Sequence, residues 1–193
     1  MRRLLMFFTA LTFLTSLAFA GNYSVDKTHT SVGFSVTHMV ITDVDGKFKD
    51  FEVDLTFDPE NLASFNVVAT IQIASVDTEN QKRDDHLRSP DFFDATTHPT
   101  MVFKSSKLEK TDKGYIAHGT LTIRGVTKDV KLAFEVKGPI KGPWGNTRIG
   151  IKGTTVIDRQ DFGVKWSKVM DGGGFVVSDE VEITIAGQFI KNK

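Results

Sequence analysis

The stretch FEVDLTFDPENLASFNVVATIQI, residues 51–73, decides the fold class, because apolar and polar side chains alternate along both of its halves. Apolar residues occupy every second position from Phe51 to Phe57, and the same spacing returns from Phe65 to Ile73. Such alternation is typical of strands that bury one face. The stretch therefore predicts two half-buried strands.

The same alternation extends outward from this stretch toward both ends of the chain. It recurs in residues 32–38, 101–103, 115–123, 130–136, more weakly 149–155, and 181–189. Turn signals such as DVDGK, TDKG, RGVTK and KGPWGN separate the segments. Such short connections join only antiparallel neighbours, since a parallel pair needs a crossover of a dozen or more residues. The sequence predicts an all-β fold of about eight antiparallel strands, as a barrel or a sandwich.

Small residues stand among the large ones on the predicted inner faces. They are Ala69, Ala117, Gly119, Gly153 and Gly187. A closed eight-stranded barrel is filled by its own side chains or holds one small ligand, so small inner residues favour a hollow barrel. The alternative is that the glycines mark bulges or tight bends, where large neighbours fill the gap.

Residues 1–20, MRRLLMFFTALTFLTSLAFA, are typical of a secretory signal peptide, with two arginines, a charge-free apolar run and a closing A-x-A motif. The alternative is a membrane anchor, but the apolar run is slightly short for a span and no basic cluster follows it. We expect cleavage after Ala20 and a single domain over residues 21–193. The expected location is periplasmic or secreted, without stable membrane insertion after cleavage.

Charge and cysteine content exclude several classes of function. Removal of residues 1–20 leaves 22 basic and 24 acidic residues, a net charge of −2, which is not the basic excess of a nucleic-acid-binding domain. The chain has no cysteine, so neither disulfides nor thiol chemistry are available.

The segment QKRDDHLRSPDFFDATTHPT, residues 81–100, breaks the alternation and predicts a short helix. Asp77 or Thr78 is the expected N-cap, and Thr78 with Gln81 makes a capping box. Pro90 ends the helix, because the residue before a proline is disfavoured in the helical region.

The predicted helix carries charges rather than an apolar stripe. Glu79 and Arg83 stand at the favourable i,i+4 spacing. Asp84 and Arg88 have the same spacing, and Leu87 is the one apolar residue. A helix without an apolar stripe is expected to be a solvated connection at one end of the barrel.

Phe92 and Phe93 follow this helix and supply the apolar anchor that holds it against the barrel end. The charged residues are then a solvated rim with ion pairs inside the helix. The alternative is that some of them contact the polar head of a ligand.

No catalytic or metal-binding pattern emerges from the titratable residues. His86 and His98 are twelve residues apart, and no pair of ligands has the close spacing of a zinc site. Asp84 and Asp85 are adjacent, so on a helix their side chains diverge. Nucleophile-elbow, Walker and dinucleotide fingerprints are also absent. We expect no catalytic residue, no metal and no cofactor.

Seven segments, taken in order along the chain, resemble the YceI-like family. They are YSVDKTHTSVGFSVTHM (23–39), FEVDLTFDPENLASFNVVATIQIASVDT (51–78), RDDHLRSPDFFD (83–94), HPTMVFKS (98–105), GTLTIRGVTKDVKL (119–132), DRQDFGV (158–164) and SDEVEITI (178–185). The resemblance covers essentially the whole chain after its first 20 residues.

The resemblance implies a periplasmic or secreted binding protein with a lipocalin-like antiparallel β-barrel. Members of this family hold polyisoprenoids or other long amphiphiles, such as isoprenoid quinones, in an apolar channel through the barrel. Several members are homodimers, so a second copy is a candidate partner. The expected ligand is a long-chain isoprenoid or a similar lipid-like molecule.

The inner-face rows supply the expected ligand contacts. The predicted channel wall consists of Phe34, Val36, Ala69, Ile71, Met101, Phe103, Leu121 and Phe134. Each of these residues could equally be ordinary core. The charged segment adds Arg83, His86, Leu87, Phe92 and Phe93, and the segment GVKWSKVMDGGG, residues 163–174, adds Trp166 and Met170 as a second lip of the mouth.

His38 continues the inner row that starts at Val32 and places a polar group among apolar ones. Its functional interpretation is a donor to a ligand head group. The alternatives are a strand-end residue that meets solvent and a core histidine bonded to backbone. A buried polar group without a partner costs ~1 to 3 kcal/mol, so we expect His38 to have one.

Three classes of function follow from these observations. The first is a carrier or scavenger of a lipid-like molecule, for transport, storage or sequestration, which predicts a deep apolar pocket. The second is a quinone-linked enzyme or redox partner, which requires a bound cofactor. The third is a solid-core stress or interaction module, which predicts no cavity.

Overall fold

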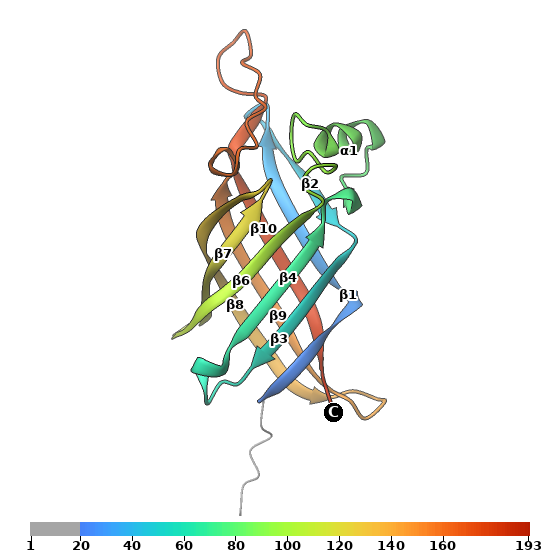
Figure 1. Cartoon of the computed structure of the whole chain (residues 1–193), viewed down its shortest axis with the longest axis vertical. Coiled ribbons are helices and arrows are strands. Elements are labelled where there is room, and N and C mark those ends of the chain that lie inside the picture. Colours follow the sequence, from blue (N-terminus) through green and yellow to red (C-terminus); the bar gives the residue numbers. More distant parts are fainter. Residues whose placement is uncertain (1–19) are drawn as a thin grey trace, which may run out of the picture.

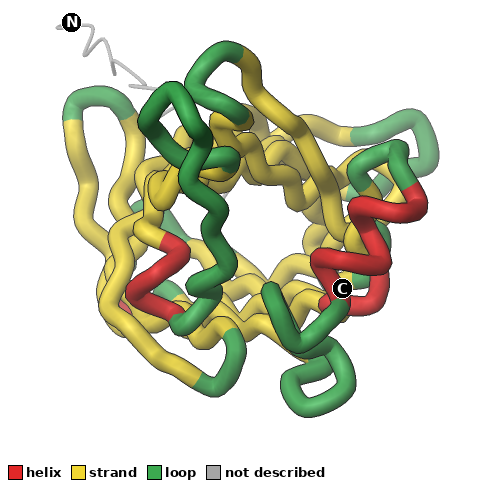
Figure 2. Tube along the Cα trace, turned by 90° about the horizontal axis from the view of Figure 1, so that it is seen from above, coloured by secondary structure: helices red, strands yellow, loops and turns green. Residues whose placement is uncertain are grey.

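Eight antiparallel strands close into a barrel in the computed structural model, which describes residues 20–193 (Figure 1). The closed ring runs in the order β10-β9-β8-β7-β6-β4-β3-β1, and β1 pairs with β10 to complete it. The strands are β1 (Gly21–His38), β3 (Phe51–Phe57), β4 (Asn66–Gln72), β6 (Thr100–Thr111), β7 (Gly114–Ile123), β8 (Val126–Lys141), β9 (Thr147–Asp158) and β10 (Val177–Lys191). Viewed along the barrel, they form a ring (Figure 2). The predicted lipocalin-like barrel of about eight strands is confirmed, and the sandwich is not formed.

Two further strands extend the sheet beside β1. Residues 21–24 of β1 pair with β3, whereas residues 32–38 pair with β2 (Thr42–Phe48). The two-residue β5 (Val76–Asp77) then pairs with the end of β2. The α-helix α1 (Gln81–Arg88) and the short 3-10 helices Leu62–Ser64, Ile73–Ser75 and Arg159–Phe162 lie in the connections. Among residues 20–193, no helix is long and apolar enough to cross a bilayer.

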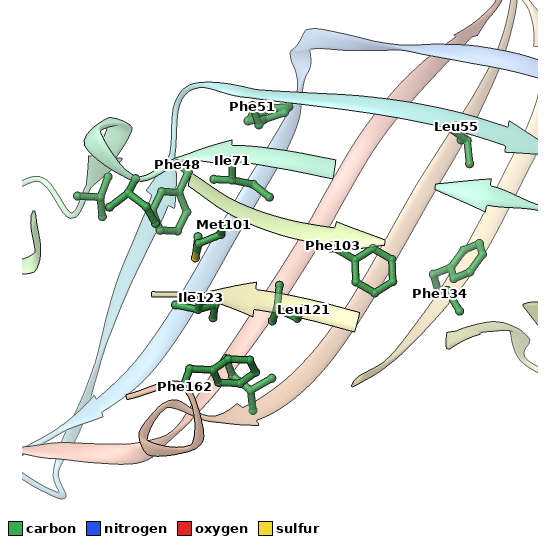
Figure 3. Close-up of a cluster of buried hydrophobic side chains, with 14 of the residues drawn as sticks. Phe48, Phe51, Leu55, Ile71, Met101, Phe103, Leu121, Ile123, Phe134 and Phe162 are labelled. Carbon is green, nitrogen blue, oxygen red and sulfur yellow. The ribbon is translucent and has the colours of Figure 1, made fainter. Parts of the chain in front are cut away.

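The alternation that predicted the strands places their apolar rows inside the barrel. In β3, Phe51, Leu55 and Phe57 are buried, whereas Glu52 and Asp54 are exposed. The side chains of Ile71, Met101, Phe103 and Leu121, from β4, β6 and β7, lie together in the interior (Figure 3). Because the ring is closed, these rows face one another around a common interior.

The inner glycines mark close approach rather than open space. A methyl group at Gly119 would collide with the Lys104 carbonyl and would lie 2.9 Å from the Phe103 ring. A methyl group at Gly153 would lie 2.8 Å from the Ala133 carbonyl, and one at Gly187 would lie 2.6 Å from Thr30. The hollow interpretation of these three glycines is therefore wrong, because their neighbours already fill the gap.

Helix α1 begins at a different residue from the one the sequence predicted. The N-cap is Asn80, whose side-chain oxygen accepts from the Arg83 amide at 3.1 Å. Thr78 does not cap the helix, because its amide and hydroxyl both donate to Asp84, at 2.9 and 2.6 Å. Glu79 lies outside the helix with a φ of 61°. The predicted capping box is thus wrong.

The predicted ion pairs inside α1 are also replaced. Asp84 is only 4% exposed and is held by Thr78 rather than by Arg88. Arg88 pairs instead with Asp85, at 2.8 Å and i,i+3 spacing. The helix ends as predicted, since Ser89 before Pro90 adopts an extended conformation.

Two arginines tie the segment around α1 to the barrel. Arg88 donates to the Ala74 carbonyl at 3.0 Å and to the Val76 carbonyl at 3.2 Å. Arg124, in the two-residue turn between β7 and β8, donates to the carbonyls of Pro90 and Phe92. The segment is therefore anchored by hydrogen bonds to backbone as well as by the predicted aromatic contact.

Gly21 and the C-terminus lie at the same end of the barrel (Figure 1), and large buried side chains fill the interior near this end. Tyr23, Phe57 and Ile149 are among the largest fully buried side chains of the described residues. The ring of Phe57 packs edge-on against Tyr115 at 5.3 Å, and Tyr115 stacks on Phe134 at 5.5 Å. This aromatic cluster fills the lower interior.

A half-buried ion pair stands beside this end. Arg148 Nη1 lies 2.6 Å from Asp26 Oδ2, and the Thr28 hydroxyl donates to Asp26 Oδ1 at 2.7 Å. These contacts, with His29 at 3.0 Å, hold the pKa of Asp26 well below its usual range, and the largest contribution comes from Thr28. Asp26 thus ionises more readily in the folded chain than in the unfolded chain.

Asp26→Asn should lower the free energy of unfolding at neutral pH. The depressed pKa means that the stabilisation is complete above the ordinary carboxyl pKa of about 4 and is lost as the pH falls below it. The difference in stability between wild type and Asp26→Asn should accordingly be largest at pH 7 and shrink below about pH 4. Urea unfolding at several pH values measures this difference, with the exposed Asp112→Asn as control. A difference that does not change with pH would contradict the assignment.

Candidate ligand-binding cavity

A cavity of about 360 Å³ occupies the interior of the barrel. Typical ligand pockets measure about 300 to 1,000 Å³, so this volume suits a small molecule. Most of the lining side chains are apolar, and the polar exceptions are Thr30, His38, Thr78, Arg83, His86, Thr155 and Arg159. The interior can therefore surround an apolar ligand chain with apolar side chains along most of the length of the cavity.

The inner rows show where the barrel is hollow. Val36, Val181 and Ile183 line the cavity and stay half-buried although they point inward. Ala69 and Ala117 also line it, so the small-residue prediction holds for the two alanines. Beyond these residues, toward the end that holds Tyr23 and Phe57, the large side chains are fully buried.

The cavity is accessible at the end where α1 lies. Arg83, on α1, lines it and is itself exposed, and His86 and Trp166 beside it are half-buried. His38, the last residue of β1, and Val176, which directly precedes β10, line the cavity at the same end. The mouth is therefore formed by α1, the end of β1 and the segment that leads into β10.

All but one of the predicted site residues line this cavity. They are Phe34, Val36, His38, Ala69, Ile71, Arg83, His86, Leu87, Phe92, Phe93, Met101, Phe103, Leu121, Phe134 and Trp166. Their contact with a ligand stays a prediction.

Met170 is the exception and does not line the cavity. Val169 pairs with Phe175, and the Gly173 amide donates to the Met170 carbonyl at 2.9 Å. This tight turn carries Met170 away from the barrel interior and onto Gly174, where its methyl group packs. The prediction that Met170 forms part of a second lip of the mouth stays a prediction.

An aromatic cluster forms one side of the mouth. The His86 ring lies 4.9 Å from Phe92 and 5.2 Å from Trp166, and Phe92 lies 5.2 Å from Trp166. His86 Nε2 also lies 3.0 Å from Asp91 Oδ2, which orients the imidazole. Trp166 therefore stands beside the charged helix, a placement that the sequence left open.

A polar relay holds Arg83 at the mouth. Arg83 Nε donates to Thr78 Oγ1 at 2.8 Å, and Nη2 donates to the Thr78 carbonyl at 2.7 Å. The same Thr78 hydroxyl donates to the buried Asp84 carboxylate. Arg83 Nη1 makes no hydrogen bond within residues 20–193. This donor, at the edge of a guanidinium that Thr78 holds in place, is therefore available to a polar group in the mouth.

Arg159 is a mouth residue that the sequence interpretation missed. It is 5% exposed and donates to the carbonyls of Val164, Trp166 and Ser178, at 2.7 to 2.8 Å. It also pairs with Asp179 at 3.0 Å, and burial lowers the pKa of Arg159 below its ordinary value while Asp179 opposes that shift. Arg159 thus ties the segment that carries Trp166 to the start of β10.

His38 stands at the end of β1, on the cavity wall. Its side chain makes no hydrogen bond to another residue between 20 and 193, so the expected protein partner is not found. It is half-buried at a strand end, which fits the alternative in which the imidazole meets solvent.

No group of three or more histidine, cysteine, aspartate or glutamate side chains in the described part of the chain could hold a metal ion. The arrangement at the mouth instead combines an apolar interior with fixed hydrogen-bond donors at its entrance. Such a site can bind an amphiphile with its chain inside and its polar head outside.

Comparison with known proteins agrees with this geometry. The YceI-like domain matches residues 23–189. The UPF0312 protein plu2095 of Photorhabdus laumondii is 40% identical over 158 residues, which cover 81% of this chain and 82% of that protein. The crystal structure of the Campylobacter jejuni YCEI protein has a TM-score of 0.70 and 40% identity, and covers 89% of this chain and 98% of its own.

A more distant structure shares the fold alone. It is a polyisoprenoid binding domain from Saccharophagus degradans, with a TM-score of 0.62 and 15% sequence identity, covering 88% of this chain and 98% of its own.

Phe92→Ala should destabilise the protein by about 3 to 5 kcal/mol, because a buried aromatic truncation loses its packing and leaves a cavity. Phe92 is 7% exposed and contacts both His86 and Trp166. Phe175→Ala is the matched control, since Phe175 is 48% exposed and its loss should cost within about 0.5 kcal/mol. Chemical denaturation measures the free energy of unfolding of both variants. Equal losses of this free energy in the two variants would rule out Phe92 as the anchor of the mouth.

Proposed function

This chain belongs to the YceI-like domain family, and on that basis we propose that it is a binding protein that holds one long-chain, isoprenoid-like amphiphile in its barrel. The observation that carries the proposal is the apolar cavity whose arginine and histidine side chains all lie at its open end. The apolar chain would occupy the interior, and the polar head would lie at the mouth near Arg83, His86 and His38. The solid-core alternative is wrong, because it predicts no cavity.

Isoprenoids fit the cavity better than polar substrates do. The wall away from the mouth consists of apolar residues such as Phe103, Leu121 and Phe134, and its polar side chains are two threonines, Thr30 and Thr155. The distant relative from Saccharophagus degradans is described as a polyisoprenoid binding domain, which supports the same ligand class. The chain would act as a carrier or store rather than as an enzyme.

The location and assembly of the protein are part of the proposal. Residues 1–20 would direct export, followed by cleavage, to the periplasm or the exterior, and they lie almost wholly outside the described residues. There, a lipid-like molecule needs a carrier to cross water. A homodimer is compatible with this role.

The expected affinity follows from the area that the ligand buries. A chain of about 15 carbons yields ~12 kcal/mol gross, at ~0.8 kcal/mol per methylene. Loss of motion on binding offsets about a third of this, which leaves about 8 kcal/mol and therefore roughly micromolar affinity. Mass spectrometry of an organic extract of the purified protein tests the proposal directly, and the absence of any lipid-like molecule together with no binding in titration would refute it.

Affinity should increase with chain length and depend weakly on the head group. Each added isoprene unit that fits in the cavity should tighten Kd by about tenfold, since burial of its carbons outweighs the cost of ordering them. Fluorescence titration with short-chain and long-chain isoprenoid quinones measures the slope. Equal affinities across the series would show that the chain does not enter the barrel.

Ala69→Phe should block binding while the fold survives. Ala69 lines the cavity, so a ring at this position enters open space. Val68→Phe is the matched control, because Val68 is the next residue of β4 and is absent from the cavity wall. The Ala69→Phe variant should lose binding at least tenfold in Kd, to about the limit of detection for a micromolar ligand. A large drop in melting temperature without ligand would instead mean that the interior has no room for the ring, since overpacking costs ~1 to 3 kcal/mol.

A further inference from the structure

Five large apolar side chains are exposed at one end of the molecule. Met39, Val40 and Ile41, in the turn between β1 and β2, are 43%, 68% and 83% exposed. Val169 and Phe175, in the segment between the 3-10 helix Arg159–Phe162 and β10, are 65% and 48% exposed. These five, called the apolar tip below, are most of the eight exposed large hydrophobic residues in the described chain. Their concentration in two loops needs an explanation, because soluble proteins expose apolar residues singly.

The two loops of the apolar tip form one unit. The Met39 amide donates to the Val176 carbonyl at 2.9 Å, which joins the β1–β2 turn to the second loop. Val169 pairs with Phe175 across that loop. Val40 lies over Gly174, since a methyl group built on the glycine would be 3.2 Å from Val40 Cγ2. The second loop projects beyond the strands at the end of the barrel near α1 (Figure 1).

The turn that carries the apolar tip is unfavourable for the residues in it. Met39 and Val40 have φ angles of 52° and 64°, a region that branched side chains rarely adopt. Glycine or asparagine would occupy this turn without strain and would suit its exposure. Strain that is kept together with an exposed apolar side chain points to a use for that side chain.

The apolar tip is continuous with the mouth of the cavity. His38 and Val176 line the cavity, and they directly adjoin Met39 and Phe175 in the chain. Trp166, on the loop that ends in Val169, also lines it. A surface that covers the apolar tip therefore covers the entrance as well.

The apolar tip itself carries no charge, and two exposed lysines stand on one of its two loops. No ionisable side chain is present from Met39 to Thr42, whereas Lys165 and Lys168 are exposed on the second loop, with Asp171 as the one acidic residue of that loop. Asp43 and Asp45 follow on β2 and are exposed, but Asp43 accepts from Thr37. Apolar residues at the extremity with lysines behind them are typical of interfacial binding.

The size of the apolar tip argues against a protein partner. A standard protein interface uses about 20 to 30 residues on each side. The apolar tip presents five residues on two narrow loops, which is enough to enter a lipid headgroup layer but too small for such an interface.

We propose that the apolar tip docks reversibly on a lipid bilayer, with the cavity mouth facing the membrane. Met39, Val40, Ile41, Val169 and Phe175 enter the headgroup layer, and Lys165 and Lys168 lie near the lipid phosphates. An amphiphile then moves between bilayer and barrel without crossing water. Docking of this kind is peripheral, and it does not depend on which molecule the barrel holds.

Flotation with vesicles of phosphatidylcholine and phosphatidylglycerol in equal amounts tests the proposal. The double variant Ile41→Glu and Phe175→Glu should lower the partition constant by about tenfold or more, because the charges oppose entry into the headgroup layer. The matched control is Ile140→Glu with Trp144→Glu, which changes one exposed apolar residue near the end of β8 and one on the turn that follows, and should leave binding unchanged. All variants are prepared in the same form as the wild type, so that residues 1–19 contribute equally.

Two further variants test whether a loss of vesicle binding could come from misfolding, and whether the lysines contribute to binding. The milder Ile41→Ser should reduce vesicle binding while the melting temperature stays that of the wild type. Lys165→Glu with Lys168→Glu should reduce binding to the anionic vesicles more than to pure phosphatidylcholine, since exposed charges act through the lipid surface potential.

Three results would overturn the proposal. They are failure of the wild type to float with vesicles, an equal loss in the Ile140 and Trp144 control, and a change of oligomeric state in the Ile41 and Phe175 variant with vesicle binding intact. The last would show that the apolar tip is covered by a second copy of the chain. A protein that binds vesicles but no long-chain amphiphile would refute the proposed function and leave membrane docking in place.

Discussion

The antiparallel pairing of β1 with β10 is the constraint on which the rest of the structure depends. It joins the first strand to the last, from Tyr23 opposite Lys191 to His38 opposite Val177, and so converts an open sheet into a ring. Only after closure do the alternating apolar rows face one another around a common space. The same pairing sets the place of the mouth, because His38 and Val177 end the pair at the open end.

The sequence predicted the strands because their physical cause is local. Alternation at period two needs no knowledge of partners, and it also placed Ala69, Met101 and Phe103 on the cavity wall. Arg159 could have been found in the same way, since it continues the inner row of Ile151, Thr155 and Ile157. A charged residue on an inner row is a signal that the polar end of the barrel begins there.

The features that the sequence did not predict depend on contacts between distant atoms. Thr78 has the chemistry of an N-cap, but Asp84 takes its amide and hydroxyl, and Asn80 caps the helix instead. Gly119 looks like empty space until the Phe103 ring and the Lys104 carbonyl are placed against it. Met170 has the polarizable side chain of an adaptable lip, but a turn closed by Val169 and Phe175 points it elsewhere. In each case the residue type was suitable and its neighbours decided the outcome.

The barrel is open at one end and closed at the other by Tyr23, Phe57 and the aromatic cluster beside them. A ligand in such a barrel enters and leaves by the same end, so the part of the ligand that enters first leaves last. If the proposed function holds, the ligand must be loaded and released at the same end of the barrel, and it cannot pass through from one end to the other. In a barrel with one open end, the depth of the interior and the width of the entrance affect different rates. A deeper interior would slow dissociation of the ligand, whereas the width of the entrance would set how fast a ligand enters an empty barrel.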